Sequence, residues 1–445
     1  MDMVIKQTNS KTAVTFLSGS SGELDWILPI LDFLLKKHFN IKIIFLTRHA
    51  RYSVENNKFL FDFIRKKNSF IEIIFCGGYF WERIEKVSYL LHRLALKFSI
   101  SKKVPFSFAY KILDAFFKKI FFFRLPTNLL DLKDDINIFL LEYPSLRRPR
   151  NNWVRNFFAK SIFFYCPHSP HVYAEDLNIE YSKNESVDYE KKSYLLLGHP
   201  ADYQMINDGK ELSSPELEKL FIGHPKYSDG WLKDLRKKSL QSRKMAKFND
   251  EVTVLVLSRG KGSYLDDDSY KYLVNKTVQS LKSTLPNFNL LIKKHPREME
   301  IDWDNLANDN DFISIKNDHI LNLATQVDFV ISFWSSGAMD CHTLGVPVIE
   351  FYDPNRNPKQ QVYTESRDEF TTIYRKLGMV ASADNQEELQ EEISRLRQSN
   401  FVISEEGIHS FYSDLLSRSN GWEEKIEKIL EFNNLNFENH LSSKN

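Results

Sequence analysis

The feature that most constrains the fold of this chain is an alternation of strand-like and helix-like segments that runs through the sequence twice. It extends from residue 12 to residue 222, and a second series begins at residue 252. The stretch between them, residues 228–250, is charged and contains serines but has no strong core pattern. Alternating strands and helices predict parallel sheets with right-handed crossovers. We therefore predict an α/β chain with two Rossmann-like domains that face each other across a cleft.

The length of the chain supports this division, because 445 residues exceed what one ordinary hydrophobic core organises. We predict an N-terminal domain over residues 1–230, a linker over residues 231–250, a C-terminal domain over residues 251–415, and a C-terminal helix and tail over residues 416–445. Strands in the first domain are expected at residues 12–17, 41–47, 70–76, 136–141, 161–166, 194–197 and 220–222. In the second domain they are expected at residues 252–257, 288–293, 312–315, 329–332 and 346–351. Ligands of such a pair of domains bind at the carboxyl ends of the strands.

The chain is nearly neutral, but its charge is unevenly placed. The formal net charge is +1, which argues against a general nucleic-acid binder, and a hydrophobic content of 42% excludes a mainly disordered chain. Residues 86–124, within an insertion predicted over residues 86–130, carry nine basic residues against one acid and so a charge of +8, which leaves −7 for the remainder. The basic residues are Lys86, Arg93, Lys97, Lys102, Lys103, Lys111, Lys118, Lys119 and Arg124.

The same segment holds eight phenylalanines. Lysine and arginine are attracted to anionic lipid, and phenylalanine inserts at the membrane interface. We therefore predict that residues 86–124 dock peripherally on an anionic membrane surface, at the cytoplasmic leaflet. An insertion whose phenylalanines pack into the core while its lysines stay solvated is the alternative.

Cysteine usage and the N-terminus indicate the compartment. Cys76, Cys166 and Cys341 are odd in number and far apart, so they predict buried reduced thiols rather than a disulfide framework or a metal cluster. The N-terminus has no signal-peptide pattern, and no window offers about 20 uncharged apolar residues. We expect a cytoplasmic protein, placed peripherally on the inner face of the plasma membrane.

The loop after the first strand is rich in small residues. Ser18, Gly19 and Gly22 precede a helix, an arrangement whose amides suit a phosphate of a nucleotide donor. An ordinary tight turn has the same composition. Glu23 and Asp25 follow at the mouth of the crevice, and each is a candidate general base, although helix capping and the helix dipole explain them equally well.

Two histidines follow the strand expected at residues 161–166, in the order Pro-His-Ser-Pro-His. The prolines make the turn rigid, and His168 is the candidate that would deprotonate an acceptor hydroxyl. A metal site would need a third ligand beside His168 and His171, and none is evident, so we expect no metal. Surface histidines in a stiff loop are the alternative.

A basic turn follows the strand at residues 288–293. It contains Lys294, His295, Pro296 and Arg297. Cationic side chains at the carboxyl edge of a sheet suit the phosphate of a leaving nucleotide. The proline restricts the backbone of His295, so that its side chain is presented rather than wound into a helix. A solvated basic turn is the alternative.

A second phosphate-binding pattern follows the strand at residues 329–332. Ser335, Ser336 and Gly337 begin a helix, where hydroxyls and free amides converge on one point. The serines alone would also suit an N-cap, but their position after the His-Pro turn favours binding. The chain then returns to a buried strand near whose end lies Glu350, which we include in the donor site. Residues 223–229 are expected to form the hinge and the floor of the crevice.

The order of these elements resembles the donor-binding half of GT-B glycosyltransferases. The pairs His295-Pro296 and Ser335-Ser336 look especially like those of enzymes that use cytidine nucleotides, namely bacterial sialyl- and polysialyltransferases, Kdo transferases of capsule synthesis and teichoic-acid glycerophosphate transferases. The resemblance implies that His295, Ser335 and Ser336 contact the donor phosphate. The glycerophosphate transferases also have a catalytic His-Gly turn, and its nearest match here is His168-Ser169. The acidic-acidic-Gly motif of the sialyltransferases has no clear equivalent.

The resemblance implies a metal-independent transferase without a cofactor, acting in the synthesis of a bacterial surface polysaccharide such as capsule or lipopolysaccharide. It would move a sugar from a nucleotide-activated donor to a glycan or lipid-linked acceptor. Two other classes stay open. The same fold serves UDP-N-acetylglucosamine 2-epimerases, whose first loop, Gly-Thr-Arg-Pro-Glu, differs from the Ser-Gly-Ser-Ser-Gly-Glu found here. A non-catalytic module that binds a nucleotide sugar is the third class.

Overall fold

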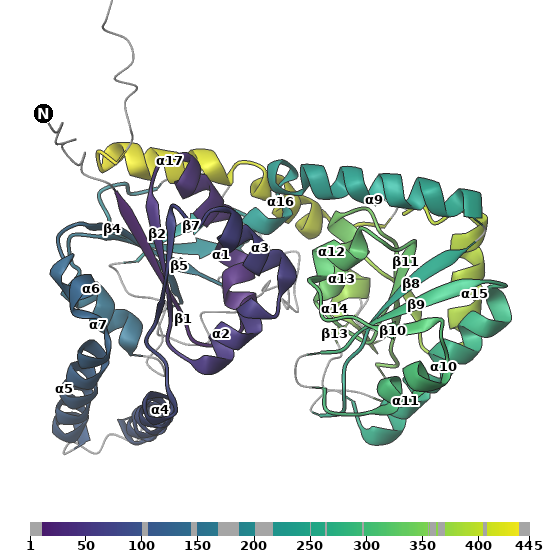
Figure 1. Cartoon of the computed structure of the whole chain (residues 1–445), viewed down its shortest axis with the longest axis horizontal. Coiled ribbons are helices and arrows are strands. Elements are labelled where there is room, and N and C mark those ends of the chain that lie inside the picture. The colour runs from purple at the N-terminus through teal and green to yellow at the C-terminus, as the bar shows by residue number, and fades with distance from the viewer. Residues whose placement is uncertain are drawn as a thin grey trace, which may run out of the picture.

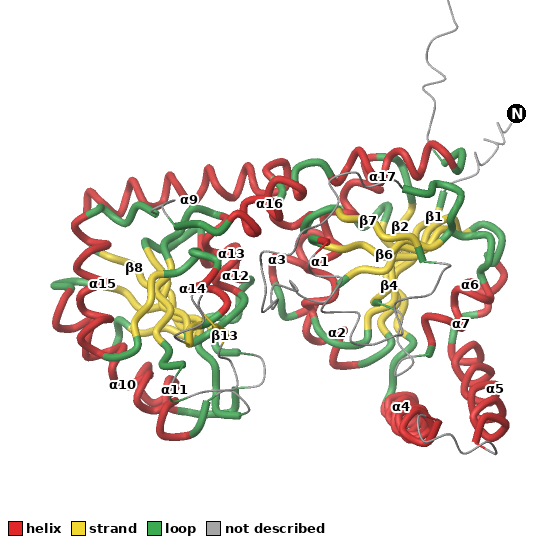
Figure 2. The backbone as a smooth tube through the Cα atoms, turned by 180° about the vertical axis from the view of Figure 1, so that it is seen from behind, coloured by secondary structure: helices red, strands yellow, loops and turns green. Residues whose placement is uncertain are grey.

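The computed structural model describes residues 11–99, 106–143, 149–167, 187–200, 217–249, 251–262, 265–295, 298–354, 356, 362–363, 370–403 and 407–435. These residues form two α/β domains that lie side by side, with several helices along one edge of the pair (Figure 1). Each domain has a central sheet with helices on both faces (Figure 2).

The N-terminal domain is built on a parallel seven-stranded sheet in the order β3-β2-β1-β4-β5-β6-β7. The strands are β1 (Thr12–Leu17), β2 (Asn40–Phe45), β3 (Ile71–Phe75), β4 (Ile136–Glu142), β5 (Ile162–Cys166), β6 (Ser193–Leu197) and β7 (Glu218–Phe221). The helices are α1 (Ser21–Lys36), α2 (Arg48–Glu55), α3 (Lys58–Lys66), α4 (Tyr79–Ser99), α5 (Phe106–Arg124), α6 (Thr127–Asp131) and α7 (Arg150–Phe157). Strand β1 is buried along its whole length, as a strand covered on both faces must be.

The C-terminal domain has a parallel six-stranded sheet in the order β10-β9-β8-β11-β12-β15. Its strands are β8 (Val252–Leu257), β9 (Phe288–Lys293), β10 (Ile313–Ile315), β11 (Phe329–Ser332), β12 (Val348–Phe351) and β15 (Ala381–Ala383), beside an antiparallel ribbon of β13 (Val362–Tyr363) and β14 (Phe370–Thr371). The helices are α10 (Asp267–Thr284), α11 (Asp302–Asp309), α12 (Ile320–Ala324), α13 (Gly337–Thr343), α14 (Ile373–Lys376) and α15 (Gln386–Gln398). Read from the first strand of each domain, both orders begin 3-2-1-4-5-6, which confirms the predicted pair of Rossmann-like domains.

Both faces of the N-terminal sheet are covered by apolar clusters. On one face, Leu28 of α1 packs in the same cluster as Trp422 and Ile426 from the C-terminal region of the chain. On the other face, Phe117 and Phe121 of α5 pack with residues of α6, α7 and the strands. Cys76, Cys166 and Cys341 are free and buried, as predicted from the sequence.

The chain passes between the domains twice. The first passage is the 3-10 turn η2 (Pro225–Tyr227) and the long helix α9 (Asp229–Asn249), and the second joins α16 (Ser410–Ser419) to α17 (Trp422–Phe432). The residues expected to be a linker therefore lie in a helix, and Leu232 of α9 is buried in the same cluster as Leu321 of α12. Helix α16 packs on the C-terminal domain and α17 on the N-terminal domain.

The two passages contact each other. The amide of His224 donates a 2.8 Å hydrogen bond to Ser419 Oγ, and the amide of Asp229 donates to Asn420 Oδ1 at 2.7 Å. Gly223 has φ +66°, and a Cβ there would lie 2.2 Å from the amide nitrogen of Ser419. Only glycine therefore fits where the passages cross.

Helices α4 and α5 pack against each other and project from the N-terminal domain (Figure 1). The aromatic segment is split between two faces of α5: Phe117 and Phe121 are 7% exposed, whereas Phe116 is 57% and Phe123 is 83% exposed. Among the described residues, no helix combines the length and the apolar character needed to cross a bilayer.

Candidate functional site

Each sheet has a topological switch point, where the strand order reverses and the loops on either side diverge. In the N-terminal sheet it lies between β1 and β4, and in the C-terminal sheet between β8 and β11. Ligands of open parallel sheets bind at this point, outside the carboxyl ends of the strands. The predicted motifs at residues 18–25 and 335–337 directly follow β1 and β11, so both lie at a switch point.

The small-residue loop after β1 is already occupied by a carboxylate of its own chain. Glu23 accepts hydrogen bonds from the amides of Ser18, at 2.7 Å, and Gly19, at 2.9 Å. Gly22 donates to Ser20 Oγ, which caps α1. A Cβ at Gly19 would lie 2.5 Å from Glu23 Oε1, so the absence of a side chain at Gly19 leaves room for this carboxylate. The amides predicted to bind a phosphate thus bind Glu23, whose carboxylate is held in the loop.

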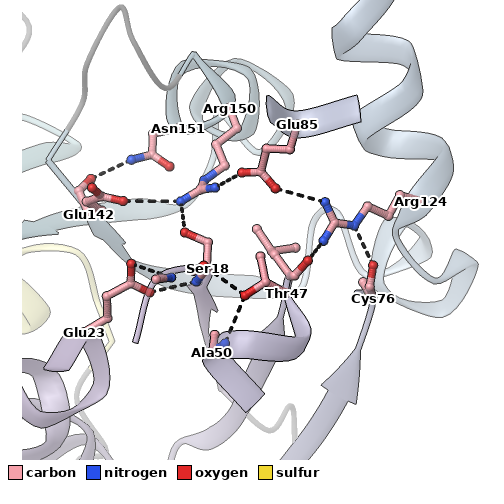
Figure 3. A network of polar contacts seen from close by, with 12 residues as sticks. Ser18, Glu23, Thr47, Ala50, Cys76, Glu85, Arg124, Glu142, Arg150 and Asn151 are labelled. Atoms are coloured by element: carbon pink, nitrogen blue, oxygen red, sulfur yellow. Dashed lines mark hydrogen bonds and ion pairs between the residues drawn. The ribbon is translucent and has the colours of Figure 1, made fainter. Parts of the chain in front are cut away.

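Two buried arginines lie beside this loop (Figure 3). Arg150, at the start of α7, donates to Ser18 Oγ at 2.5 Å and pairs with Glu85 and Glu142. Arg124 pairs with the same Glu85 and donates to two backbone carbonyls at the ends of β2 and β3. Burial alone would lower the pKa of Arg150, but the surrounding carboxylates outweigh it and raise the pKa. The arginines are therefore fixed cations at the carboxyl edge of the sheet.

A buried charge cluster joins the two domains. Lys226 of η2 lies 2.6 Å from Asp25 Oδ2 of α1 and 2.8 Å from Asp340 Oδ1 of α13. His319, at the start of α12, lies 2.9 Å from Asp25 Oδ1 through Nε2. The Nδ1 atom of His319 accepts an amide of α12, so the hydrogen-bond pattern places the ring proton on Nε2, from which it is donated to Asp25.

The cluster also fixes the ionisation of Asp25 and Lys226. Burial alone would raise the pKa of Asp25, but Lys226 and His319 outweigh it and hold the pKa well below its usual range. Burial would lower the pKa of Lys226, but Asp25 and Asp340 outweigh it and raise the pKa. Both oxygens of Asp25 are engaged, so this carboxylate is a poor proton acceptor and a strong interdomain contact.

The His295 turn after β9 is clamped by a buried carboxyl group. Glu298 is 8% exposed, and its Oε2 accepts a 3.1 Å hydrogen bond from the amide of His295. Its Oε1 accepts hydrogen bonds from Ser258 Oγ at 2.8 Å and from the Tyr270 hydroxyl at 3.1 Å. Burial raises the pKa of Glu298, against the effect of these donors. Lys294 points to the other side of the turn, where its ammonium lies 2.6 Å from Asp304. The turn thus holds the backbone of His295 beside β8.

The serine motif after β11 begins with a strained residue. Trp334 has a φ of +56°, a backbone conformation that residues with a side chain rarely adopt. Its carbonyl accepts a 2.8 Å hydrogen bond from Arg259, which follows β8. Ser335 Oγ accepts from the amide of Gly337 at 3.3 Å, where α13 begins. A Cβ at Gly337 would lie 2.7 Å from the Cδ1 atom of Ile320, so a larger residue would force the Ile320 side chain to move. Ser336 is the N-cap residue and makes no side-chain cap bond.

Glu350 is fully buried at the end of β12. Its Oε1 accepts from Thr372 and lies 3.0 Å from Arg375 Nε, while Oε2 has no hydrogen-bond partner in the described part of the chain. Burial raises the pKa of Glu350, and Arg375 opposes this. Arg375 also donates to the carbonyl of Tyr352 at 2.6 Å, so the pair ties β12 to α14.

Three predicted site residues lie outside the described residues: His168, Pro296 and Arg297. The described residues contain no group of three or more histidine, cysteine, aspartate or glutamate side chains that could hold a metal ion.

The structure also brings forward residues that the motifs did not single out. Arg150 and Arg124 meet over Glu85 although 26 positions or more separate any two of them, and only the sheet brings them together. Arg259 was detectable in principle, since it follows the first strand of its domain as Ser18 does. Lys226 lies in the predicted hinge, but nothing in the local sequence indicates its two carboxylate partners.

Comparison with known proteins identifies the fold. No family model matches the chain, and no curated protein matches it in sequence. Among solved structures, the chain is similar to a histidine-to-asparagine variant of the wall teichoic acid polymerase TagF, with a TM-score of 0.52 and 10% identity over 96% of this chain and 90% of that chain. A histidine-to-alanine variant of TagF gives a TM-score of 0.51 and 11% identity over 97% and 92% of the two chains.

A UDP-GlcNAc 2-epimerase of Methanocaldococcus jannaschii, in complex with UDP-GlcNAc and UDP, is also matched, with a TM-score of 0.46 and 15% identity over 94% of this chain and 99% of that chain. The likeness to TagF covers both domains. It confirms the predicted GT-B fold, with two Rossmann-like domains facing each other across a cleft.

Proposed function

We propose that this chain is a GT-B transferase that moves a sugar, or a glycerophosphate-like group, from a nucleotide-activated donor onto a glycan acceptor of the bacterial cell surface. The observation that carries the proposal is the C-terminal switch point, where the clamped His295 turn after β9 and the Ser335–Gly337 helix start after β11 flank β8. Hydrogen bonds hold the backbone of both segments at the carboxyl edge of the sheet, where this fold binds its ligands.

In this proposal the donor phosphate lies between His295 and the start of α13. The hydroxyls of Ser335 and Ser336 donate to phosphate oxygens at this helix start. Arg259, which already holds the carbonyl of Trp334, adds a cation near the leaving group, and Arg297 of the same basic turn as His295 adds another. Lys294 acts indirectly, because its pairing with Asp304 fixes the turn. We propose a cytidine nucleotide because the His-Pro and Ser-Ser pairs resemble those of cytidine-nucleotide enzymes.

We propose His168 as the general base. Of the three candidates, Glu23 binds the amides of its own loop and Asp25 is paired with Lys226 and His319. In the sequence, His168 follows the last residue of β5 by two positions. In the sugar-transfer reaction, the acceptor oxygen bonds to the anomeric carbon and its proton passes to His168. The bond between the anomeric carbon and the phosphate oxygen of the nucleotide breaks, and the nucleotide leaves with the electron pair of that bond. The proposal requires neither a metal ion nor a cofactor.

We also propose that the α4–α5 hairpin docks on the anionic inner surface of the plasma membrane. Lys86, Lys111 and Lys119 are exposed on it beside Phe116 and Phe123. Arg124 does not take part, because its side chain is 4% exposed and pairs with Glu85. The exposed lysines therefore supply the basic surface, and the exposed Phe116 and Phe123 are available for insertion.

The donor is tested by thermal shift with CMP, CDP, UDP and GDP. We expect the cytidine nucleotides to raise the melting temperature most, because binding to the folded state stabilises it. Conversion of UDP-N-acetylglucosamine without any acceptor would instead indicate an epimerase. His295→Ala is expected to remove nearly all transfer while its circular dichroism and melting temperature stay close to those of the wild type. Near-normal transfer by this folded variant would contradict the assignment.

Membrane docking is tested by flotation with vesicles of phosphatidylglycerol or phosphatidylcholine. The variant Phe116→Asp/Phe123→Asp should lose binding to the anionic vesicles. Phe70→Asp is the matched control, because Phe70 is 56% exposed but lies before β3, at the opposite edge of the sheet. Equal flotation of all three proteins would reject docking through the hairpin.

A further inference from the structure

A cavity of about 610 Å³ lies between the carboxyl edge of the N-terminal sheet and the α4–α5 hairpin. Its polar end is the switch point of the sheet, where Ser18 follows β1 and Arg150 begins α7. Its walls come from the hairpin, through Trp81, Ile84 and Ile120. A volume of several hundred Å³ is the size of a small-molecule site. The hairpin also contributes Glu85 and Arg124, so the cavity combines a charged end near the switch point with an apolar wall.

The polar end is fixed before any ligand binds (Figure 3). The Arg150 side chain is 7% exposed and is held by Ser18, Glu85 and Glu142. Its Nε–H has no acceptor in the described part of the chain. A buried donor without an acceptor is costly, so an oxygen atom of a ligand that reached Arg150 Nε would bind favourably.

The cavity lining carries charges of both signs. The cations are Lys86, Arg124 and Arg150, and the carboxylates are Glu82 and Glu85. Glu85 pairs with both arginines and Glu142, outside the lining, pairs with Arg150, so neither guanidinium faces a phosphate as an uncompensated cation. A hydroxyl group, in contrast, donates to a carboxylate and accepts from a guanidinium. The polar end therefore suits an uncharged head that carries several hydroxyls, as a saccharide does.

The apolar wall continues out of the cavity along α4. Ile84 lines the cavity, Val87 follows three residues later and is 51% exposed, and Leu90 follows after three more and is 56% exposed. Residues three apart on a helix are neighbours, so these side chains form a continuous apolar row. An apolar chain that starts in the cavity can leave it along this row without crossing a polar surface.

Helix α1 connects the polar end to the C-terminal domain. Helix α1 begins three residues after Ser18, and Asp25 of α1 contacts His319 and Lys226 at the domain boundary. Helix α13 is tied to the same Lys226 through Asp340. A head group held beside Ser18 would therefore lie at the start of the helix that contacts the proposed donor domain.

We propose that this cavity is the acceptor site and that the acceptor is an amphiphile, a saccharide head bound at Ser18, Glu85 and Arg150 on an apolar chain that leaves along the hairpin. The inference deepens the transferase function proposed above and rests on it. It separates the two domains by role, with the donor held by the C-terminal domain and the lipid-borne acceptor by the N-terminal domain.

The test uses two soluble probes with the same head. The full chain is titrated by calorimetry with octyl β-D-glucoside, below its micellar concentration, and with methyl β-D-glucoside. The octyl compound should bind at least tenfold more tightly. Ile120→Trp fills the cavity from α5 and should abolish this preference, whereas Ile112→Trp, the same change at a 54% exposed position of the same helix, should retain it. Ile84→Trp fills the cavity from α4 and is the second variant should Ile120→Trp fold poorly.

Equal affinity for the two probes, or an unchanged preference in a folded cavity-filling variant, would overturn the proposal. Nucleotide binding, measured by the thermal-shift panel on the same variants, should not change. Failure of the wild type to bind any nucleotide would count against the proposed transferase function, whereas loss of the octyl preference alone would count against the acceptor site.

Discussion

Replacement of Lys226 by methionine tests the interdomain charge cluster. Methionine keeps an apolar stem of similar length but removes the ammonium group, which lies over the Trp26 ring and faces Asp25 and Asp340. Lys226 is 2% exposed, so the two carboxylates would stay largely out of water without their partner. Breaking a buried ion pair by removing one partner lowers the free energy of unfolding by about 3–5 kcal/mol. At about 2–4 °C per kcal/mol for a domain of this size, a loss of about 3 kcal/mol lowers the melting temperature by roughly 6–12 °C.

The pH dependence of the free energy of unfolding provides a second test of this prediction. Asp25 has a pKa below its unfolded value, so in the wild type it contributes stability above about pH 4 that is lost as the pH falls further. In Lys226→Met the burial of Asp25 is opposed by one cationic partner fewer, so protonation becomes easier. The difference in stability between the two proteins should therefore narrow from pH 7.5 to pH 5.

The assay is thermal unfolding followed by circular dichroism at pH 7.5, 6 and 5. Lys271→Met is the matched control, since Lys271 pairs with Asp267 on the surface, where both side chains are about half exposed, and it should change little at any of these pH values. A melting temperature within 2 °C of the wild type, or a difference that does not change with pH, would refute the role assigned to Lys226.

Two further substitutions test the crossing of the chain and the donor turn. Gly223→Ala should lower the melting temperature markedly, because φ is +66° and the new Cβ would lie 2.2 Å from the amide nitrogen of Ser419. Gly421→Ala is the control and should be tolerated, because a Cβ at Gly421 would have no atom within 4 Å. Glu298→Gln replaces one carboxylate oxygen with an amide group, so either the His295 amide or the hydroxyls of Ser258 and Tyr270 lose their acceptor. We expect nucleotide affinity to fall about tenfold, which corresponds to about 1.4 kcal/mol. Equal affinity of variant and wild type in a titration would show that the turn does not need Glu298.

The fold followed from the sequence because its signal is local. Strands such as β1 and β8 are continuous apolar runs between polar or small residues, and the structure places them at the expected positions. Three short strands were missed: β15 has three residues, and β13 and β14 have two each, too few to show a period. Helix α9 was missed as a packed element because its buried face is narrow among charged residues.

The site was less accessible, because its important contacts are between distant parts of the chain. The sequence indicated where Glu23 and Asp25 lie but not that the first binds the amides of Ser18 and Gly19 and the second a lysine 201 positions away. Those partners depend on how α1 meets η2, which no local pattern describes. The same holds for Arg150, whose identity as a buried cation follows from the sheet order that brings α7 beside β1.

The double passage of the chain between the domains decides where a motion of the cleft can be observed. Helix α17 returns the end of the described chain to the domain in which it starts, and the two passages are hydrogen-bonded to each other at Ser419 and Asn420. Strand β1 and helix α17, the first and last described elements, thus belong to the same domain. A pair of fluorescent labels on α3 and α17 would report on that domain alone, so a measurement of cleft motion needs one label on α10 or α15.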